Sequence, residues 1–216
     1  MNDCQHKPGR TTRNTNRAMT TKDDEHPLKA LLGPILLLKV ADPDKWKKPH
    51  MKNFKESFSH HGPEKDTLQA LDKKELVLLY FSAAWCPPCQ KFSPLLKKFY
   101  KACQETEGIN IEVVYVSSDR DLGEFQEYYS QMPWLAIESQ KHKTIATKKC
   151  HIQGIPSLVV LNGEGKFVTD QARNAVAAAA GNLDKVKALV EEWKAIEAVP
   201  LEEAKFSSFA PLCSIL

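Results

Sequence analysis

Hydrophobic and polar positions alternate in blocks between residues 76 and 129. Leu76–Ser82 is a continuous apolar run, which predicts a strand buried on both faces of a sheet. From Pro88 to about Gln104 apolar residues recur at helical spacing, and Ile111–Ser117 predicts a second buried strand. A second helix is expected over Leu122–Tyr129. Two buried strands joined by a helix predict a right-handed β-α-β unit and hence an α/β fold class.

The flanking segments extend this pattern. Asn162–Gly165 stands between two short apolar runs, Leu158–Leu161 and Phe167–Val168, and predicts an antiparallel hairpin. A first strand is expected at Ile35–Val40, and a final amphipathic helix at Leu183–Ala198. No internal repeat is visible in the chain.

The same pattern divides the chain into regions. Residues 1–27 are rich in Thr, Asn, Arg and Lys, show no apolar period, and are expected to form a disordered basic tail. One domain is expected over residues 28–198, followed by a C-terminal tail at 199–216. Within the domain, residues 41–65 form a polar insert that is longer than ordinary loops.

The insert contains a short basic amphipathic stretch. Met51, Phe54 and Phe58 fall at helical spacing among lysines. Their apolar face either packs on the domain or serves as a membrane or partner surface.

The chain of 216 residues, 42% hydrophobic and 26% charged, has the size of one domain with tails. Its longest apolar stretch, Leu28–Val40, is too short to span a bilayer and is broken by Gly33 and Pro34. Acidic residues precede that stretch and no small-residue cleavage site follows it, which argues against a signal peptide. Asp3 and the lack of an apolar face argue against a transit peptide. We therefore expect a reducing, cytoplasmic location.

Charge is distributed unevenly. Residues 1–65 hold 13 Lys and Arg against 8 Asp and Glu, while the rest of the chain holds 17 against 19. The positive charge therefore belongs to the tail and the insert. The slightly acidic remainder gives little support to a nucleic-acid partner.

Six cysteines are scattered along the chain, with one close pair, so they do not resemble a secreted disulfide framework. The pair, Cys86-Pro87-Pro88-Cys89, sits where a predicted strand ends and a helix begins. A bare Cys-x-x-Cys is either half a zinc site or a redox pair. A zinc site would need a second cluster of ligands, and the sequence provides none, so no metal is expected.

The redox interpretation has a physical basis. With Pro87 and Pro88 as the first helical residues, Cys86 falls at the N-cap, where the helix dipole stabilises a thiolate. Cys89 lies one turn into the helix on the same side and should be better shielded from solvent. Cys86 is therefore predicted to be the attacking thiol and Cys89 the resolving thiol.

Five motifs appear in an order that resembles the tryparedoxin and nucleoredoxin branch of the thioredoxin superfamily. They are Phe-Ser-Ala-Ala-Trp-Cys-Pro-Pro-Cys (81–89), Val-Tyr-Val-Ser-Ser-Asp (114–119), Met-Pro-Trp-Leu-Ala (132–136), Gly-Ile-Pro (154–156) and Thr-Asp-Gln-Ala-Arg (169–173). The resemblance covers about residues 30–195. It implies a thioredoxin-like fold with a central mixed β-sheet flanked by helices.

The resemblance also implies roles for individual residues. Trp85 would shield the sulfurs, and Pro94 would be the kink proline of the active-site helix. Pro156 would be a cis-proline facing the cysteines, and the backbone of Ile155 would pair with an extended substrate segment. Further substrate-groove or supporting positions implied by the resemblance are Pro87, Pro88, Met132, Pro133 and Trp134. The alternatives are that Pro94 begins a separate helix, Pro156 is a strand-edge proline, and Trp134 belongs to the core.

Two positions depart from the pattern of related proteins. Tyr80 stands where thioredoxins have a buried aspartate, so the proton of Cys89 must move through water, Tyr80 or another acid. Gln90 replaces a basic residue that often follows Cys-Pro-Pro-Cys in this branch, which puts a preference for acidic or glutathione-like partners in doubt. Cys150 precedes Pro156 by a few residues and is either a buried structural cysteine or a regulatory thiol.

The resulting hypothesis is a monomeric thiol-disulfide oxidoreductase that reduces protein disulfides, including those of peroxiredoxin-like substrates. It needs no cofactor besides the redox-active disulfide of Cys86 and Cys89. Its electrons would come from an upstream thiol or a flavin reductase. The alternative is a redox-switched binding module, in which the state of the same two cysteines gates a partner.

The last four residues loosely match a prenylation signal. Cys213 would carry the lipid, and the terminal leucine points to a geranylgeranyl group. One lipid chain anchors a protein only marginally, and the basic N-terminal third could supply a second signal. Membrane tethering through Cys213 is therefore kept as a hypothesis.

Overall fold

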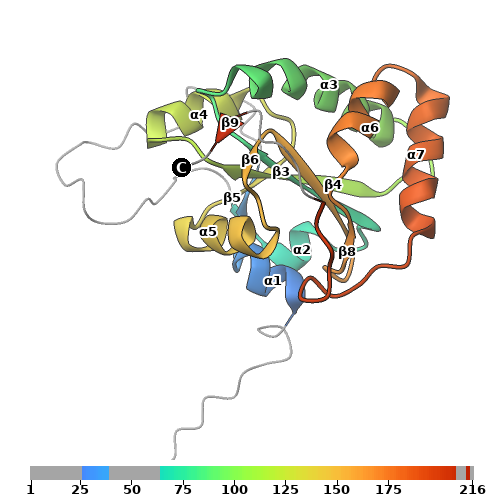
Figure 1. Cartoon of the computed structure of the whole chain (residues 1–216), viewed down its shortest axis with the longest axis horizontal. Coiled ribbons are helices and arrows are strands. Elements are labelled where there is room, and N and C mark those ends of the chain that lie inside the picture. The colour runs from blue at the N-terminus through green and yellow to red at the C-terminus, as the bar shows by residue number, and fades with distance from the viewer. Residues whose placement is uncertain (1–25, 39–63, 208–212, 215–216) are drawn as a thin grey trace, which may run out of the picture.

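A seven-stranded mixed sheet forms the centre of the computed structural model, which describes residues 26–38, 64–207 and 213–214 (Figure 1). The strand order is β2-β1-β5-β4-β3-β7-β8. Strands β3, β4 and β5 run parallel, and the remaining pairs are antiparallel. The bounds are β1 Ile35–Leu37, β2 Glu64–Asp66, β3 Leu76–Ser82, β4 Ile111–Ser117, β5 Leu135–Ile137, β7 Ser157–Asn162 and β8 Phe167–Thr169.

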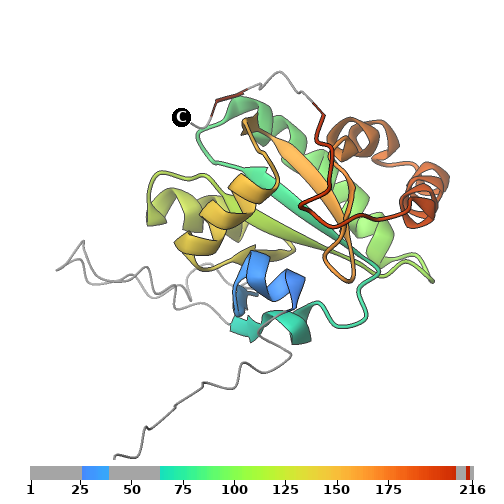
Figure 2. The ribbon, with the colours of Figure 1, turned by 60° about the horizontal axis from the view of Figure 1, so that its bottom comes forward.

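Helices cover both faces of this sheet, as Figure 2 shows from a second direction. One hydrophobic core is formed with α3, α4, α6 and α7, and the other with α1 and α5. The thioredoxin-like arrangement of a mixed sheet flanked by helices is thereby confirmed. The bounds are α1 Pro27–Leu32, α2 Thr67–Ala70, α3 Pro87–Gln104, α4 Leu122–Ser130, α5 Gln140–Lys149, α6 Ala172–Ala179 and α7 Leu183–Ala195.

Strand β3 shows why the central sheet is apolar on both sides. All seven of its residues are buried. Leu78 and Tyr80 belong to one core, while Val77, Leu79 and Phe81 belong to the other. The continuous apolar run predicted this two-sided burial correctly, because side chains of successive strand residues point to opposite faces.

Element boundaries differ from the prediction in a few places. Helix α7 ends at Ala195 rather than Ala198, because Ile196 turns to an extended backbone with ψ 130°. Strand β1 ends at Leu37, three residues before the predicted end. Helices α1, α2 and α5 were not predicted. Their short or weakly periodic sequences give little signal by themselves.

Some predicted regions lie outside the described residues. This holds for residues 1–25 of the expected tail and for residues 39–63, which include nearly all of the insert. The last two residues of the predicted insert, Glu64 and Lys65, belong to strand β2, which pairs antiparallel with β1.

The residues after α7 return to the domain. Val199 exchanges two backbone hydrogen bonds with Phe167, of 2.7 and 3.0 Å. The ring of Phe206 packs against the rings of Phe167 and His151, at 4.8 and 4.9 Å between centroids. Beyond residue 212, β9 (Cys213–Ser214) pairs antiparallel with β6 (Gly154–Ile155). The predicted tail is therefore packed on the domain over much of its described length.

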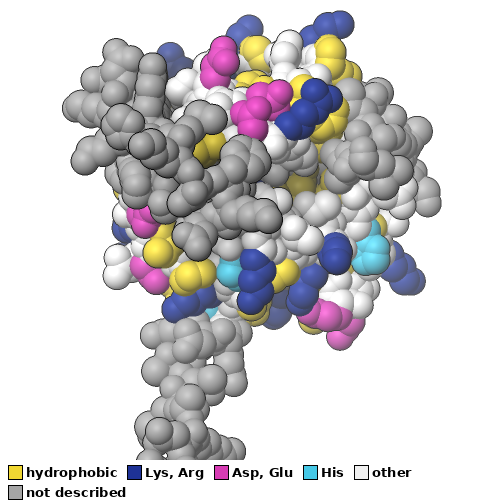
Figure 3. All heavy atoms as spheres, turned by 90° about the vertical axis from the view of Figure 1, so that its left-hand side faces the viewer, with side chains coloured by type: hydrophobic (Ala, Val, Ile, Leu, Met, Phe, Trp, Pro, Cys, Tyr) yellow, Lys and Arg dark blue, Asp and Glu magenta, His cyan; other side chains and the backbone are white. Residues whose placement is uncertain are grey.

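Basic side chains are also present on the domain itself. Figure 3 shows Lys and Arg side chains in the lower part of the face that carries α5. This helix holds exposed Lys141, Lys148 and Lys149, of which Lys149 pairs with Glu202 at 3.0 Å. Among the described residues, no helix is long and apolar enough to cross a membrane.

Candidate active site

Cys86 lies between the end of β3 and the start of α3. It is the N-cap residue of α3, with φ −99° and ψ 105°, and Pro87 and Pro88 are the first helical residues. Cys89 follows one turn later. The predicted N-cap position is thus confirmed. The predicted difference in shielding is wrong, because both Cys86 and Cys89 are 0% exposed.

A carboxylate fixes the loop that leads to Cys86. The backbone N–H of Ala84 donates to Oδ1 of Asp119 at 2.6 Å. Oδ2 of the same carboxylate accepts hydrogen bonds from Tyr115 at 2.5 Å and Ser117 at 2.6 Å. Because Tyr115 and Ser117 belong to β4, Asp119 ties the loop to the neighbouring strand.

Trp85 is held from two sides beside the cysteines. Its indole Nε1 donates to the carbonyl of Ser118 at 2.9 Å, and the guanidinium of Arg120 lies 5.1 Å from the ring centroid. Gln90 Nε2 donates to the carbonyl of Ala84 at 2.6 Å. Gln90 therefore supports the same loop through a neutral hydrogen bond.

The Gly-Ile-Pro motif packs directly on Cys86. The Ile155–Pro156 peptide bond is cis, as the family resemblance implied. The thiol of Cys86 contacts the carbonyl oxygen of Ile155 at 3.8 Å. Arg173 donates from Nη1 to the carbonyl of Pro156 at 3.3 Å. Burial lowers the pKa of Arg173, and the nearby Cys89 opposes that shift.

Four buried hydroxyl groups lie at the first turn of α3, beneath Cys89. Tyr80 donates to the Cys89 carbonyl at 3.4 Å and shares a hydrogen bond of 2.8 Å with Ser93. Ser82 donates to Tyr80 at 2.9 Å, and Ser93 lies 2.6 Å from the Tyr128 hydroxyl. Burial raises the pKa of both Tyr80 and Tyr128, so this hydroxyl cluster (Tyr80, Ser82, Ser93 and Tyr128) is neutral.

Comparison with known proteins identifies the family to which this chain belongs. The thioredoxin-like domain family matches residues 74–167. Tryparedoxin of Trypanosoma brucei brucei is 40% identical over 103 residues, 46% of this chain and 70% of that protein. Tryparedoxin II of C. fasciculata superimposes with a TM-score of 0.55 at 32% identity, over 70% of this chain and 91% of that one. This chain belongs to the thioredoxin-like family of tryparedoxins and nucleoredoxins.

Members of this family differ in size. A probable nucleoredoxin 1 of Arabidopsis thaliana is 43% identical over 130 residues, which are 60% of this chain but only 22% of that protein. The chain therefore spans less than a quarter of the length of that nucleoredoxin. The tryparedoxins match it over a larger share of their own length.

Two of the groove positions implied by the family resemblance lie in the core instead. Met132 and Trp134 are each 1% exposed. The Trp134 ring packs edge-on against Tyr80 at 6.0 Å and Tyr100 at 5.8 Å. The prediction that Met132 and Trp134 line a substrate groove is therefore wrong in this structure. Pro133 between them is half-buried.

Cys103 and Cys150 are two further cysteines among the described residues, and both are buried. Burial raises the pKa of both Cys103 and Cys150 to about 12, and neither has more than 1% of its surface exposed. Thiols of this kind stay protonated and act as small apolar side chains. Cys4 lies outside the described residues. Pro94 lies inside α3, which continues unbroken to Gln104.

Sequence reasoning missed three contributors to the site. Asp119 ends one of the recognised motifs, yet that motif did not indicate that its carboxylate ties down the active-site loop, while Asp121 caps α4. Arg173 belonged to a recognised motif, and that motif could have pointed to it. Tyr128 gave no signal, because only tertiary packing brings α4 to the cysteines. Within the described part of the chain, no group of three or more His, Cys, Asp or Glu side chains could hold a metal ion.

Proposed function

We propose that this protein is a thiol-disulfide oxidoreductase that reduces protein disulfides. The observation that carries the proposal is the position of Cys86 at the N-cap of α3, with Cys89 one turn on and the Ile155 carbonyl at 3.8 Å. The positive end of a helix dipole favours a thiolate at Cys86. Membership of a family of thiol oxidoreductases supports the same chemistry.

The reaction consists of two exchange steps. The Cys86 thiolate attacks one sulfur of a substrate disulfide, the substrate S–S bond breaks, and its electron pair leaves on the other substrate sulfur. Cys89 then attacks Sγ of Cys86 in the mixed disulfide. The substrate leaves as a dithiol, reduced by two electrons. Cys86 and Cys89 have lost those two electrons and are joined in a disulfide. An upstream thiol or flavin reductase returns the protein to the dithiol form.

Neighbouring groups assist each step. The edge at Ile155 would pair with an extended substrate segment, and Trp85 would cover the reacting sulfurs. The hydroxyl cluster is the set of buried groups beneath Cys89 that carries exchangeable protons. We assign the proton transfer at Cys89 to that cluster, which occupies the region below the helix start in place of a carboxylate.

Insulin reduction tests the proposal. The dithiol protein should reduce insulin catalytically with a recycling reductant, and Cys86→Ser should lose at least a thousandfold in rate. Cys103→Ser is the matched control, because Cys103 is buried far along α3 and should leave the rate unchanged. If the wild-type protein is oxidised once without turnover, it acts as a redox-switched binding module instead.

A further inference from the structure

The two residues that precede the cis-proline already have a strand partner. Strand β6 (Gly154–Ile155) does not belong to the seven-stranded sheet. It pairs antiparallel with β9, which places Gly154 opposite Ser214 and Ile155 opposite Cys213. Figure 1 shows β9 beside β6, near the N-terminal part of α3. The backbone edge proposed above for substrates is therefore occupied by the chain itself.

This pairing brings the backbone of Cys213 close to the attacking thiol. Directly opposed residues of an antiparallel pair have Cα atoms about 4.5 to 5.5 Å apart. Cys213 is opposed to Ile155, and the carbonyl of Ile155 lies 3.8 Å from Sγ of Cys86. Cys86 itself is 0% exposed, so a protein disulfide does not reach its sulfur in this arrangement.

A second contact holds the chain just before β9. The backbone N–H of Ser207 donates to Oδ2 of Asp170 at 2.6 Å, and its hydroxyl donates to Oδ1 at 3.1 Å. Phe206 packs between aromatic rings of the domain. Cys213 follows Ser207 by six residues, so it is tethered to the domain by a short segment. Because both groups belong to one chain, their encounter is intramolecular, which raises their effective concentration relative to that of separate molecules.

We propose that the segment at Cys213–Ser214 is an internal substrate of the active site, and that Cys213 exchanges with the Cys86–Cys89 disulfide. The proposal rests on the function proposed above. In the step, the Cys213 thiolate attacks Sγ of Cys86. The Cys86–Cys213 bond forms, the Cys86–Cys89 bond breaks, and the electron pair remains on Cys89, which takes up a proton. One thiol and one disulfide exist before and after, so no external oxidant is required.

The consequence is competition between the internal segment and protein substrates. While β9 is paired with β6, an incoming extended segment must displace it before its own disulfide meets Cys86. The internal disulfide of Cys86 and Cys213 would hold the site closed until a reductant opened it. Reduction of that disulfide would make Cys86 available to substrates again. The segment would therefore make the activity depend on the redox state of the surroundings.

Disulfide mapping in the full-length Cys89→Ser variant tests the step. With the resolving thiol removed, diamide should oxidise Cys86 and Cys213 to one intramolecular disulfide, while diamide is reduced to the hydrazine. Unlipidated recombinant protein is required, since a lipid on Cys213 would remove the thiol. Peptide mass spectrometry should find Cys86 joined to Cys213 in the monomer, at a rate independent of protein concentration. Pairing of Cys86 with Cys4 or with a second molecule instead would overturn the proposal.

A matched pair of substitutions tests the role of the strand. In the Cys89→Ser background, Ser214→Ala keeps the backbone N–H and should cross-link as fast as its parent. Ser214→Pro removes that N–H and disfavours strand pairing, so cross-linking should slow at least tenfold. Circular dichroism establishes that both variants are folded. Equal cross-linking rates would show that β9 pairing does not deliver the thiol.

Competition between the internal segment and protein substrates is measured in protein that retains both Cys86 and Cys89. Ser214→Pro should raise kcat/KM for insulin at least twofold relative to Ser214→Ala, and equal values would contradict the competition. The mapping experiment needs no turnover, so its outcome is separate from that of the insulin assay. A Cys86–Cys213 cross-link without insulin reduction would overturn the proposed function and leave the internal pairing in place.

Discussion

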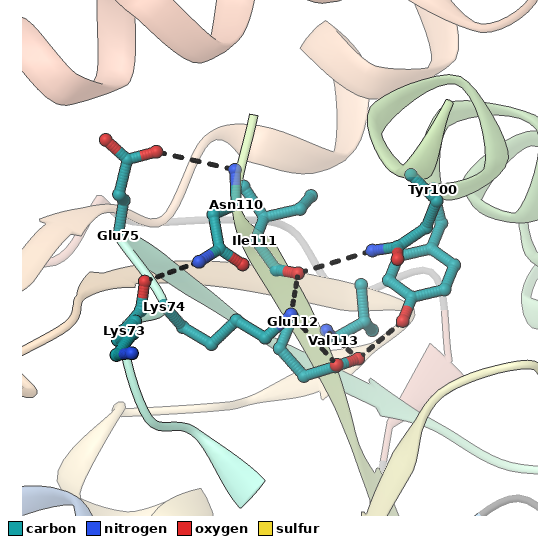
Figure 4. Close-up of polar contacts among 9 residues, drawn as sticks. Lys73, Lys74, Glu75, Tyr100, Asn110, Ile111, Glu112 and Val113 are labelled. Atoms are coloured by element: carbon teal, nitrogen blue, oxygen red, sulfur yellow. Dashed lines mark hydrogen bonds and ion pairs between the residues drawn. The ribbon is translucent and has the colours of Figure 1, made fainter. Parts of the chain in front are cut away.

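Two buried polar clusters lie at opposite ends of the central parallel strands, and they differ in charge. The hydroxyl cluster lies where β3 ends, beneath Cys89, and consists of neutral groups. The second cluster lies near the start of β4 and contains the carboxylate of Glu112 (Figure 4). Both contain buried side chains, but charged side chains, those of Glu112 and Lys74, occur only in the second.

The carboxylate cluster (Glu112, Tyr100 and Lys74) shows what a buried charge needs. Oε1 of Glu112 accepts hydrogen bonds from the Tyr100 hydroxyl at 2.7 Å and from the Val113 N–H at 3.0 Å. Lys74 Nζ lies 3.6 Å from Oε2. Burial raises the pKa of Glu112, and the hydrogen bond from Tyr100 and the charge of Lys74 oppose that shift.

The difference teaches how each end is suited to its role. A buried carboxylate needs several fixed donors, and those donors make the far end rigid. Neutral hydroxyls under Cys89 can each donate and accept a hydrogen bond, as the proposed proton transfer at Cys89 requires. We therefore expect substitutions at the far end to change stability, and substitutions in the hydroxyl cluster to change activity.

The largest expected effect is on stability at the far end. Glu112→Ala leaves the buried Tyr100 hydroxyl without its acceptor and Lys74 without its counter-charge. The free energy of unfolding should fall by about 3 kcal/mol. Urea denaturation at pH 7 measures it, and insulin reduction by the folded variant should stay within twofold of wild type.

Glu105→Ala is the control for that substitution, because Glu105 pairs with Lys101 on the exposed surface of α3. Its effect should be within about 0.5 kcal/mol. A loss in Glu112→Ala no larger than in this control would contradict the assigned role of the cluster.

The next effect concerns a buried cation that lies near the active-site end. Lys143 is 6% exposed, its Nζ is 4.6 Å from the Phe125 ring centroid, and burial lowers its pKa to about 8. Between pH 8 and 10.5 the unfolded chain binds a proton that the folded chain has released, so folded stability rises with pH. A shift of this size corresponds to about 3 kcal/mol at most.

Comparison with Lys143→Met isolates that contribution. The free energy of unfolding of wild type minus that of the variant should increase between pH 7.5 and 10.5, measured by urea denaturation at several pH values. A difference that does not change with pH would show that Lys143 titrates alike in the folded and unfolded chains.

A smaller effect is expected in the hydroxyl cluster, and it should appear in catalysis. Tyr80→Phe removes the hydroxyl that bonds Ser82, Ser93 and the Cys89 carbonyl. Insulin reduction should slow about tenfold, at the low end of proton-transfer effects, and its pH profile should shift. Stability should fall by about 1 kcal/mol.

Tyr100→Phe makes the same chemical change at the far end of the strands. It should lower stability without altering the rate or its pH profile. If the two tyrosine variants give the same pH profile as wild type, the hydroxyl cluster does not serve Cys89.

The smallest effect is expected from Glu112→Gln. The amide oxygen still accepts from Tyr100 and Val113, while the cost of burying a charge disappears, so stability at pH 7 should change by less than about 1 kcal/mol. Because the folded pKa of Glu112 is raised, the folded chain binds the extra proton first as pH falls. Wild type should therefore gain stability relative to the variant as pH is lowered toward 4.5, and a gain in the opposite direction would contradict the sign.

Local signals in the sequence predicted the central part of the fold. The apolar run of β3, the helical spacing after Pro88 and the second apolar run of β4 each reflect burial that repeats with the period of the element. The N-cap position of Cys86 followed from the same reasoning, since two adjacent prolines are favoured in the first turn of a helix. The hairpin of β7 and β8 was also predicted, from its turn residues.

Other features depended on contacts between distant segments. The family resemblance implied a substrate-groove position for Trp134, with the core as the alternative, and Trp134 in fact meets Tyr80 and Tyr100 from two other elements in the core. Asp119 anchors a loop 35 residues earlier in the chain. No local period marks either contact, because each depends on how β4, β5 and α3 pack together.

The sequence by itself determined the place of the Cys86 and Cys89 pair between a buried strand and a helix, because short-range hydrogen bonding and side-chain periodicity depend on neighbouring residues. Only the tertiary structure decided which groups lie beneath Cys89, and that Cys213 is paired with Ile155, from which 57 residues separate it in the chain. Such pairings arise when whole elements pack together, because packing buries apolar surface and gives the backbone N–H and C=O groups at strand edges their hydrogen-bond partners. The tertiary structure thereby places a neutral hydroxyl cluster beneath Cys89 and pairs the backbone edge next to Cys86 with a segment of the chain itself.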